Sequence, residues 1–180
     1  GFILSKLKAH TYIFVDDVVT QSSATTQSIW GLPRDWSGTS PDYGMNSTVA
    51  SVHAATIKDD LKTVPSLSLS IPEEDLFGSN GIYANPLSSG INWERATSLE
   101  LIDPSSPDGS MNFQIDCGLR LQGGAFRRFD LPKKQSCRLV FKGVYGDTKL
   151  RYPLFGDLTT DEFDTLIFRM ESNDGYQWEN

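Results

Sequence analysis

The fold is decided by one stretch in the middle of the chain, Phe113-Gln-Ile-Asp-Cys-Gly-Leu-Arg-Leu121. Apolar residues occupy every second position, which is typical of a strand with one buried face. The segment 136–142, Ser-Cys-Arg-Leu-Val-Phe-Lys, has the same alternation. We predict that the two are neighbouring antiparallel strands in a fixed register, because a slip of one residue would bury the charged side chains.

The chain between these strands combines two glycines with many basic residues. Backbone N–H groups of glycine can approach a phosphate closely, and Arg or Lys can neutralise it. A Gly-Gly pair is equally typical of a simple bulge or turn. The alternation predicts that Arg120 and Arg138 project from one face beside Lys133 or Lys134. The predicted phosphate-binding residues are Arg120, Gly123, Gly124, Lys133, Lys134 and Arg138. If Arg120 serves a ligand, Arg120→Gln leaves stability nearly unchanged, whereas a large loss indicates a structural ion pair.

Working outward, further strands are predicted at residues 11–15, 66–71, 97–102 and 165–170. A helix is predicted over 54–64, ending before Pro65, with short turns at 73–77 and 161–163. Residues 20–46 show no periodicity and are expected to form a long surface loop. The predicted fold is mainly β (α+β), an antiparallel sheet or sandwich with short helices and a long irregular N-terminal arm.

The 180 residues are enough for one domain. A hydrophobic fraction of 38% and a charged fraction of 22% exclude a disordered chain and a coiled coil. No apolar run approaches 18 residues, so no membrane span is expected, and residues 1–10 are too weakly apolar for a signal peptide. We divide the chain into an irregular arm with a short strand and helix, 1–64, and a β-rich body, 65–180.

Charge is unevenly distributed along the chain. The net charge of −7 argues against a nucleic-acid partner. Residues 111–150 nevertheless carry 8 Lys and Arg against 3 Asp and Glu. This basic segment is interpreted either as a phosphate or polyanion site or as a sheet edge kept soluble by its cations.

The two cysteines, Cys117 and Cys137, match no zinc-binding pattern, and neither a metal nor another cofactor is expected. Both fall on apolar faces of the predicted strands. A cross-strand disulfide requires demanding geometry, and the sequence favours two buried free thiols.

Sequence motifs for catalysis are largely missing. There is no Gly-x-Ser-x-Gly elbow, His-Glu-x-x-His helix or Walker loop, and His10 and His53 are more typical of structural residues. The tripeptide Trp93-Glu94-Arg95 is distinctive, although an ion pair beside a packed indole explains it equally well. If the chain hydrolysed glycosides, Glu94 with Asp116 would be the first candidate pair of carboxyl groups.

Several segments together resemble the opening of the CotH-type spore-coat kinase family. The strongest are Leu119-Arg-Leu-Gln-Gly-Gly-Ala-Phe-Arg127, Pro132-Lys-Lys-Gln-Ser136 and Arg138-Leu-Val-Phe-Lys142. Shorter matches are His10-Thr-Tyr-Ile-Phe-Val15, Leu32-Pro-Arg-Asp-Trp36, Asp42-Tyr-Gly-Met45, Pro65-Ser-Leu-Ser68, Gly81-Ile-Tyr83, Trp93-Glu-Arg95, Tyr152-Pro-Leu-Phe155, Phe168-Arg169 and Asn173-Asp174. Cys137 departs from the aromatic residue expected at that position.

The resemblance implies a bacterial secreted or cell-surface protein with a kinase-like module. The family's catalytic Asp and metal-binding acid lie in a later lobe, and we expect this chain to end before them. It implies a non-catalytic fragment with a weak site for a nucleotide phosphate, since phosphoryl transfer needs metal-bound acids and a positioned base. A full-length protein would be a kinase-like phosphotransferase.

The alternative is a carbohydrate-binding or carbohydrate-active domain with a polysaccharide partner. Exposed aromatic rings in loops can stack on sugars, although such rings also anchor irregular loops. The candidates are Trp30, Trp36, Tyr43 and Trp93. A glycan-array signal lost on Trp36→Ala separates the two interpretations.

Overall fold

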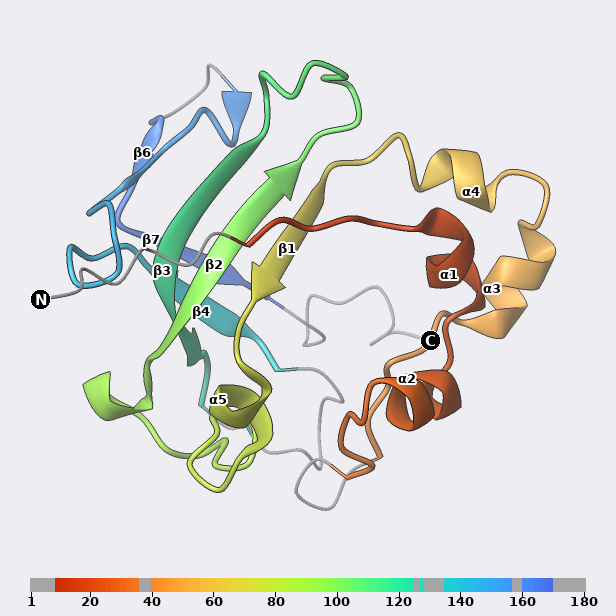
Figure 1. Cartoon of the computed structure of the whole chain (residues 1–180). Helices are drawn as coiled ribbons and strands as arrows, with labels where there is room; N and C mark the ends of the chain where they lie inside the picture. The colour runs from red at the N-terminus through yellow and green to blue at the C-terminus, as the bar shows by residue number, and fades with distance from the viewer. Residues whose placement is uncertain (1–8, 36–39, 125–126, 128–134, 157–159, 170–180) are drawn as a thin grey trace, which may run out of the picture.

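The computed structural model describes residues 9–35, 40–124, 127, 135–156 and 160–169. These residues form a mainly antiparallel β structure with a few short helices, as the alternating pattern predicts (Figure 1). The main sheet has five strands in the order β1-β2-β3-β4-β7. Their bounds are β1 Ser66–Ser70, β2 Arg95–Ile102, β3 Phe113–Leu121, β4 Cys137–Val140 and β7 Thr165–Phe168. A second sheet pairs β5 Leu150–Arg151 with β6 Glu162–Phe163.

The predicted pairing of β3 with β4 is confirmed. The two strands are antiparallel, with Leu119 opposite Leu139 and Arg120 opposite Arg138. One face of the sheet carries the core, in which Leu99, Cys117 and Leu139 are fully buried. The opposite face carries the polar positions of the same strands. Register therefore separates apolar from charged side chains, as period-two patterning requires.

Both cysteines are buried and free. Cys137 lies opposite Leu121, so Cys117 is displaced by four residues along the neighbouring strand. Four residues of strand span roughly 13 Å, well beyond the reach of a disulfide. Burial raises the pKa of Cys117 to about 12 and that of Cys137 to about 11. The two thiols therefore serve as small apolar core groups.

The N-terminal region differs from its prediction. Residues 11–15 form no strand, and helix α1, Val15–Thr20, begins where the strand was expected to end. Asp16 and Asp17 lie in the first turn of α1, where carboxylates interact favourably with the helix dipole. The expected loop over 20–46 contains helix α2, Ser23–Ile29, whose first turn is capped by the Ser22 hydroxyl.

Helix α3, Ser47–Val52, also precedes the sheet, capped by Asn46, whose side-chain oxygen accepts from the backbone N–H groups of Thr48 and Val49. The helix expected over 54–64 is confined to α4, Ile57–Asp60, and Lys58 in it pairs with Asp16 of α1. Figure 1 shows α1, α3 and α4 gathered beside the edge formed by β1. Within the described part of residues 1–64 there are thus helices and no strand.

Between α1 and the N-terminal end of the described chain, an extended segment crosses the polar face of the sheet (Figure 1). The Thr11 N–H donates to a Glu100 carboxylate oxygen at 2.8 Å, and its hydroxyl donates to Ser68 at 2.7 Å. The Gln114 amide donates to the carbonyl of Ala9. Isoleucine and tyrosine are typical of strands, but in residues 11–15 the Thr11 N–H donates to a side chain and the Phe14 carbonyl accepts from backbone N–H groups of the first turn of α1.

Two further short elements lie nearer the candidate site. Helix α5, Glu73–Phe77, follows Pro72 as predicted, and a 3₁₀ turn, Ile91–Trp93, precedes β2. The turn expected at 161–163 is wrong, because Glu162 and Phe163 form β6 against β5. No helix among the described residues is long and apolar enough to cross a membrane.

Candidate functional site

Glu94 directly precedes β2 and follows the 3₁₀ turn Ile91–Trp93, it lies on the polar face of the sheet, and its side chain is only 1% exposed. The β2–β3 register pairs Arg95 with Leu119, so Glu94 comes opposite Arg120. The Arg120 Nε donates to Glu94 Oε2 at 2.5 Å, and Arg120 Nη2 also contacts this oxygen. A buried carboxylate requires such a partner, because an unpaired charge in the interior is strongly unfavourable.

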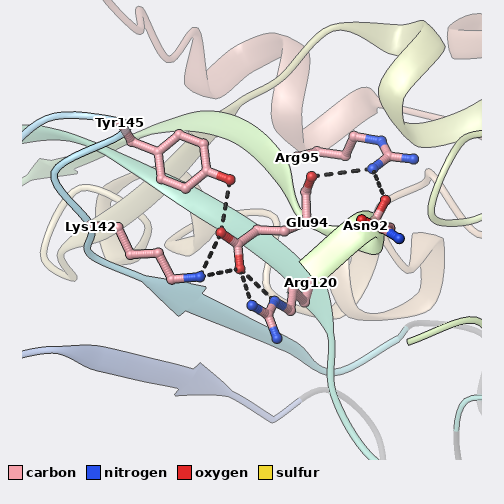
Figure 2. A network of polar contacts seen from close by, with 6 residues as sticks. All are labelled: Asn92, Glu94, Arg95, Arg120, Lys142 and Tyr145. Carbon is pink, nitrogen blue, oxygen red and sulfur yellow. Dashed lines mark hydrogen bonds and ion pairs between the residues drawn. The ribbon is translucent and has the colours of Figure 1, made fainter. Parts of the chain in front are cut away.

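Two more groups reach Glu94 from the turn after β4. The Lys142 Nζ lies 2.9 Å from each carboxylate oxygen, and the Tyr145 hydroxyl donates to Oε1 at 2.8 Å. Figure 2 shows the carboxylate enclosed by these groups and Arg120. The turn itself is closed by the Tyr145 N–H, which donates to the Lys142 carbonyl at 2.9 Å. We call Glu94, Arg120, Lys142 and Tyr145 the Glu94 cluster.

The Glu94 cluster depends on a glycine in β3. A Cβ added at Gly118 would lie 2.6 Å from Cε2 of Tyr145 and 2.7 Å from Cγ of Glu94. The missing side chain therefore makes the space in which the carboxylate and the phenol ring pack over the sheet. Gly118 occupies a position of β3 where the alternation would place a polar side chain, and any side chain there would fill the space that Glu94 and Tyr145 occupy.

Burial alone would raise the pKa of Glu94. Hydrogen bonds from Lys142, Tyr145 and Arg120 outweigh that effect and hold its pKa below the ordinary value. Burial and the neighbouring carboxylate raise the pKa of Tyr145 to about 12, so its hydroxyl keeps its proton and donates it. Glu94 is therefore a paired anion, which is the opposite of what a general acid near neutral pH requires.

Arg95 fixes the backbone beside the cluster. Its guanidinium donates to the carbonyls of Asn92 and Glu94, at 2.9 and 3.2 Å (Figure 2). It also lies 3.6 Å from a carboxylate oxygen of Asp75 and 5.5 Å from the centroid of the Trp93 ring. The sequence offered an ion pair beside a packed indole as one explanation of Trp93-Glu94-Arg95. Arg95 does lie over the Trp93 ring, but its acidic partner is Asp75, and Glu94 pairs with Arg120 and Lys142.

A pocket of about 190 Å³ opens beside the cluster, between β3, β4 and the loop before β2. Three arginines are among its described lining residues, and none of those described residues is acidic. We call it the arginine pocket. Its lining residues are Ser88, Ser89, Gly90, Trp93, Arg120, Leu121, Gln122, Gly123, Arg127 and Arg138.

The arginines differ in how their charges are compensated. Arg120 gives Nε and Nη2 to Glu94. Arg127 donates from Nη1 to the carbonyl of Ser88 at 2.8 Å, while its buried Nε has no hydrogen-bond partner. Arg138 also has a buried Nε without a partner, and its side chain forms no ion pair with any residue that the structure describes. Arg138 is thus a half-buried cation without a counter-ion in the described chain.

The predicted phosphate-binding residues are brought together in part. Arg120, Gly123 and Arg138 line the arginine pocket, whereas Gly124 is not among its lining residues. Lys133 and Lys134 lie outside the described residues. Arg120 lines the pocket, but its guanidinium is also shared with Glu94 in an ion pair, which is the structural alternative that the sequence left open for this residue.

The proposed pair of catalytic carboxyl groups gains no support from the geometry. Asp116 lies four residues along β3 from Arg120, the residue opposite Glu94, and lies opposite Ser98. That offset is roughly 13 Å along the strand, longer than the 6.5–9.5 Å typical of inverting glycosidases. The described residues also contain no group of three His, Cys, Asp or Glu side chains suited to a metal ion.

The aromatic candidates for sugar stacking are dispersed. Trp30 ends α2 and is 59% exposed. The Tyr43 hydroxyl donates to the Pro33 carbonyl at 3.1 Å, which anchors its loop. Trp36 lies outside the described residues. Trp93 is the described candidate that lines the arginine pocket.

Sequence reasoning did not assign Arg127, Ser88 or Lys142 to a site. Arg127 and Lys142 belong to the basic segment and to the segments that carry the family resemblance, and neither signal gave them a role in a site. Ser88 belongs to an unpatterned loop. No model of a protein family, no curated protein and no solved structure matches the chain.

Proposed function

We infer that this chain is a non-catalytic, β-rich binding module whose arginine pocket holds the phosphate group of a ligand. One observation carries the proposal. Arg138 lines a pocket with Arg120 and Arg127, and among the described residues no carboxylate lines this pocket and none forms an ion pair with Arg138. A cation that is partly removed from water without a counter-charge is unfavourable, and a bound anion would remove that cost.

The pocket also has the chemistry that phosphate requires. Guanidinium groups present several N–H donors in a plane and bind phosphate oxygens in pairs. Gly123 has a φ of +121°, a conformation that glycine adopts readily, so the backbone lines the pocket without a side chain. Such a backbone can approach an anion closely.

The predicted resemblance to CotH-type kinases agrees with a phosphate-binding role but stays a proposal, as does a location outside the cell or on its surface. The present proposal concerns binding and assigns no catalytic step to any residue. The polysaccharide alternative is supported only through Trp93, in the same pocket as the arginines.

The experiment is a titration of the whole chain with inorganic phosphate, followed by calorimetry or by NMR shifts, at low salt and neutral pH. The test variant is Arg138→Gln, because this residue has no ion-pair partner among the residues that the structure describes. The matched control is Arg151→Gln, since Arg151 is an exposed strand arginine paired with Glu162 away from the pocket.

We expect saturable binding that weakens at least tenfold in Arg138→Gln and weakens with added salt. The control variant should bind as the parent chain does. Absence of saturable phosphate binding, or equal loss in both variants, would overturn the proposal.

A further inference from the structure

We propose that Glu94 competes with the ligand from within the chain: its carboxylate and the bound phosphate share the guanidinium of Arg120, and Lys142 holds Glu94 when Arg120 turns to the phosphate. This inference rests on the proposed function and concerns how that same pocket is controlled. Three observations carry it: the surplus of cations around Glu94, the unequal way in which they hold it, and the position of Arg120 in the lining of the pocket.

The Glu94 cluster has more positive charge than its carboxylate needs. Arg120 and Lys142 are both cations, and Tyr145 is neutral, because its pKa is raised to about 12 and its hydroxyl keeps the proton. Two positive charges therefore face one negative charge on a side chain that is 1% exposed. A buried carboxylate needs a counter-ion, and here either cation can supply it. One cation can accordingly turn away and still leave Glu94 paired.

The two cations hold Glu94 differently. Arg120 contacts one carboxylate oxygen, Oε2, through Nε and Nη2. The Lys142 Nζ lies 2.9 Å from both oxygens, and the Tyr145 hydroxyl donates to Oε1 at 2.8 Å. Figure 2 shows Arg120 reaching the carboxylate from the side opposite Tyr145. Both carboxylate oxygens therefore keep a hydrogen bond when Arg120 turns away.

Arg120 is the member of the cluster that lines the arginine pocket, whereas Glu94, Lys142 and Tyr145 are not among its described lining residues. It lies directly opposite Arg138 across β3 and β4. Directly opposed residues of an antiparallel pair have Cβ atoms about 5 Å apart, so one phosphate group can contact both guanidinium groups. A phosphate there also lies close to the Glu94 carboxylate, and like charges repel. Glu94 therefore opposes the ligand, and Lys142 reduces that opposition.

The test titrates inorganic phosphate into the whole chain by calorimetry at about 0.15 M salt, where exposed charges more than about 8 Å apart are largely screened. Glu94→Gln removes the competing charge and should tighten phosphate binding at least fivefold. Lys142→Gln makes Glu94 depend on Arg120 and should weaken binding at least fivefold, although Lys142 is not among the described lining residues. The matched controls, Glu162→Gln and Lys149→Gln, alter an ion pair outside that lining and should change the affinity less than twofold.

A double-mutant cycle shows whether these effects pass through Arg120. In an Arg120→Gln background, Glu94→Gln and Lys142→Gln should each change the phosphate affinity less than twofold, because the shared guanidinium is gone. Effects of equal size in both backgrounds would mean that the two charges act on the ligand directly, and would overturn the proposal. A cluster that only supports the fold would weaken binding in both single variants, and that result would overturn it too.

A second measurement is made on the parent chain. The NMR signal of the Arg120 Nε–H, identified by its loss in Arg120→Gln, should shift as phosphate is added, because this group donates to Glu94 in the free chain. A signal that stays in place at saturating phosphate would overturn the proposal. Thermal unfolding checks that each variant is folded. If Glu94→Gln is unfolded, Lys142→Gln, its cycle with Arg120→Gln and the Nε–H signal decide.

The outcomes keep the two proposals apart. Phosphate binding that weakens in Arg138→Gln but is unaffected by the changes at Glu94 and Lys142 overturns the competition and leaves the phosphate pocket standing. Absence of saturable phosphate binding to the parent chain overturns both. Opposite effects of Glu94→Gln and Lys142→Gln that vanish without Arg120 support the competition.

Discussion

Arg120 and Arg138 are direct partners across β3 and β4, and of the two only Arg120 pairs with a described carboxylate. Like charges directly opposite one another in an antiparallel pair repel. Glu94 offsets the charge of Arg120 from the neighbouring strand, while Arg138 lines the pocket. Arg120 therefore has a counter-ion on one side, Glu94, whereas Arg138 on its other side has none among the described residues.

The two arginines should respond differently to the same substitution. Arg120→Gln removes charge-assisted hydrogen bonds to a buried carboxylate and should lower the free energy of unfolding by about 1.5–3 kcal/mol. Arg138→Gln removes a cation with no described partner and should change it by less than about 0.5 kcal/mol. Urea unfolding measures both. Equal losses would contradict the division of roles.

Removing the carboxylate should be more damaging than removing one of its partners. Glu94→Gln leaves Arg120 and Lys142 without their shared anion and should cost about 3–5 kcal/mol. Glu162→Gln is the control, because its pairs with Arg151 and Lys149 are exposed and contribute about 0–1 kcal/mol. Chemical denaturation compares the two, and similar values would show that the Glu94 cluster contributes little.

Acid should weaken the fold through Glu94. Its pKa in the folded chain lies below its ordinary value, so the stabilisation is fully present above that ordinary value, near 4.5, and is lost as pH falls through the folded pKa. The difference in unfolding free energy between the parent chain and Glu94→Gln should therefore be constant from pH 7 to about pH 5 and shrink below it. If the difference in unfolding free energy between the two chains grew as the pH fell below 5, the pKa of Glu94 would not be lowered in the folded chain.

Gly118 should tolerate no side chain. Gly118→Ala places a Cβ against Tyr145 and Glu94 and should cost about 1–3 kcal/mol by overpacking. Gly124→Ala is the matched control, since an added Cβ there meets nothing within 4 Å. Thermal unfolding should show a clear fall in Tm for the first variant alone. A normal Tm for Gly118→Ala would mean that the cluster can shift without loss.

The cysteines should react only after unfolding. Their raised pKa values, about 12 and about 11, and their burial leave little thiolate at neutral pH. A thiol reagent should therefore modify neither residue in the folded chain and both in denaturant, without prior reduction. Modification of fewer than two thiols in denaturant would indicate a disulfide and contradict the strand offset between them.

The sequence by itself determined the sheet. Alternation in 113–121 and 136–142 was enough to predict two antiparallel neighbours and to place Arg120 and Arg138 on one face, because a strand has only two faces and one must be apolar. The same reasoning failed for residues 11–15, where apolar residues without strict alternation lie outside the sheet. It also missed α2, whose polar residues give no amphipathic pattern.

Only the tertiary structure decided which acid meets which cations. Glu94 is 26 residues from Arg120 and 48 from Lys142, and the chain has 23 acidic residues from which a partner could come. Strand register places Glu94 opposite Arg120, the turn after β4 brings Lys142 and Tyr145 over it, and the missing side chain of Gly118 makes the space. A one-dimensional pattern fixes which face a residue occupies; the partners on that face depend on how loops close across strands, because a buried charge must find compensation in three dimensions.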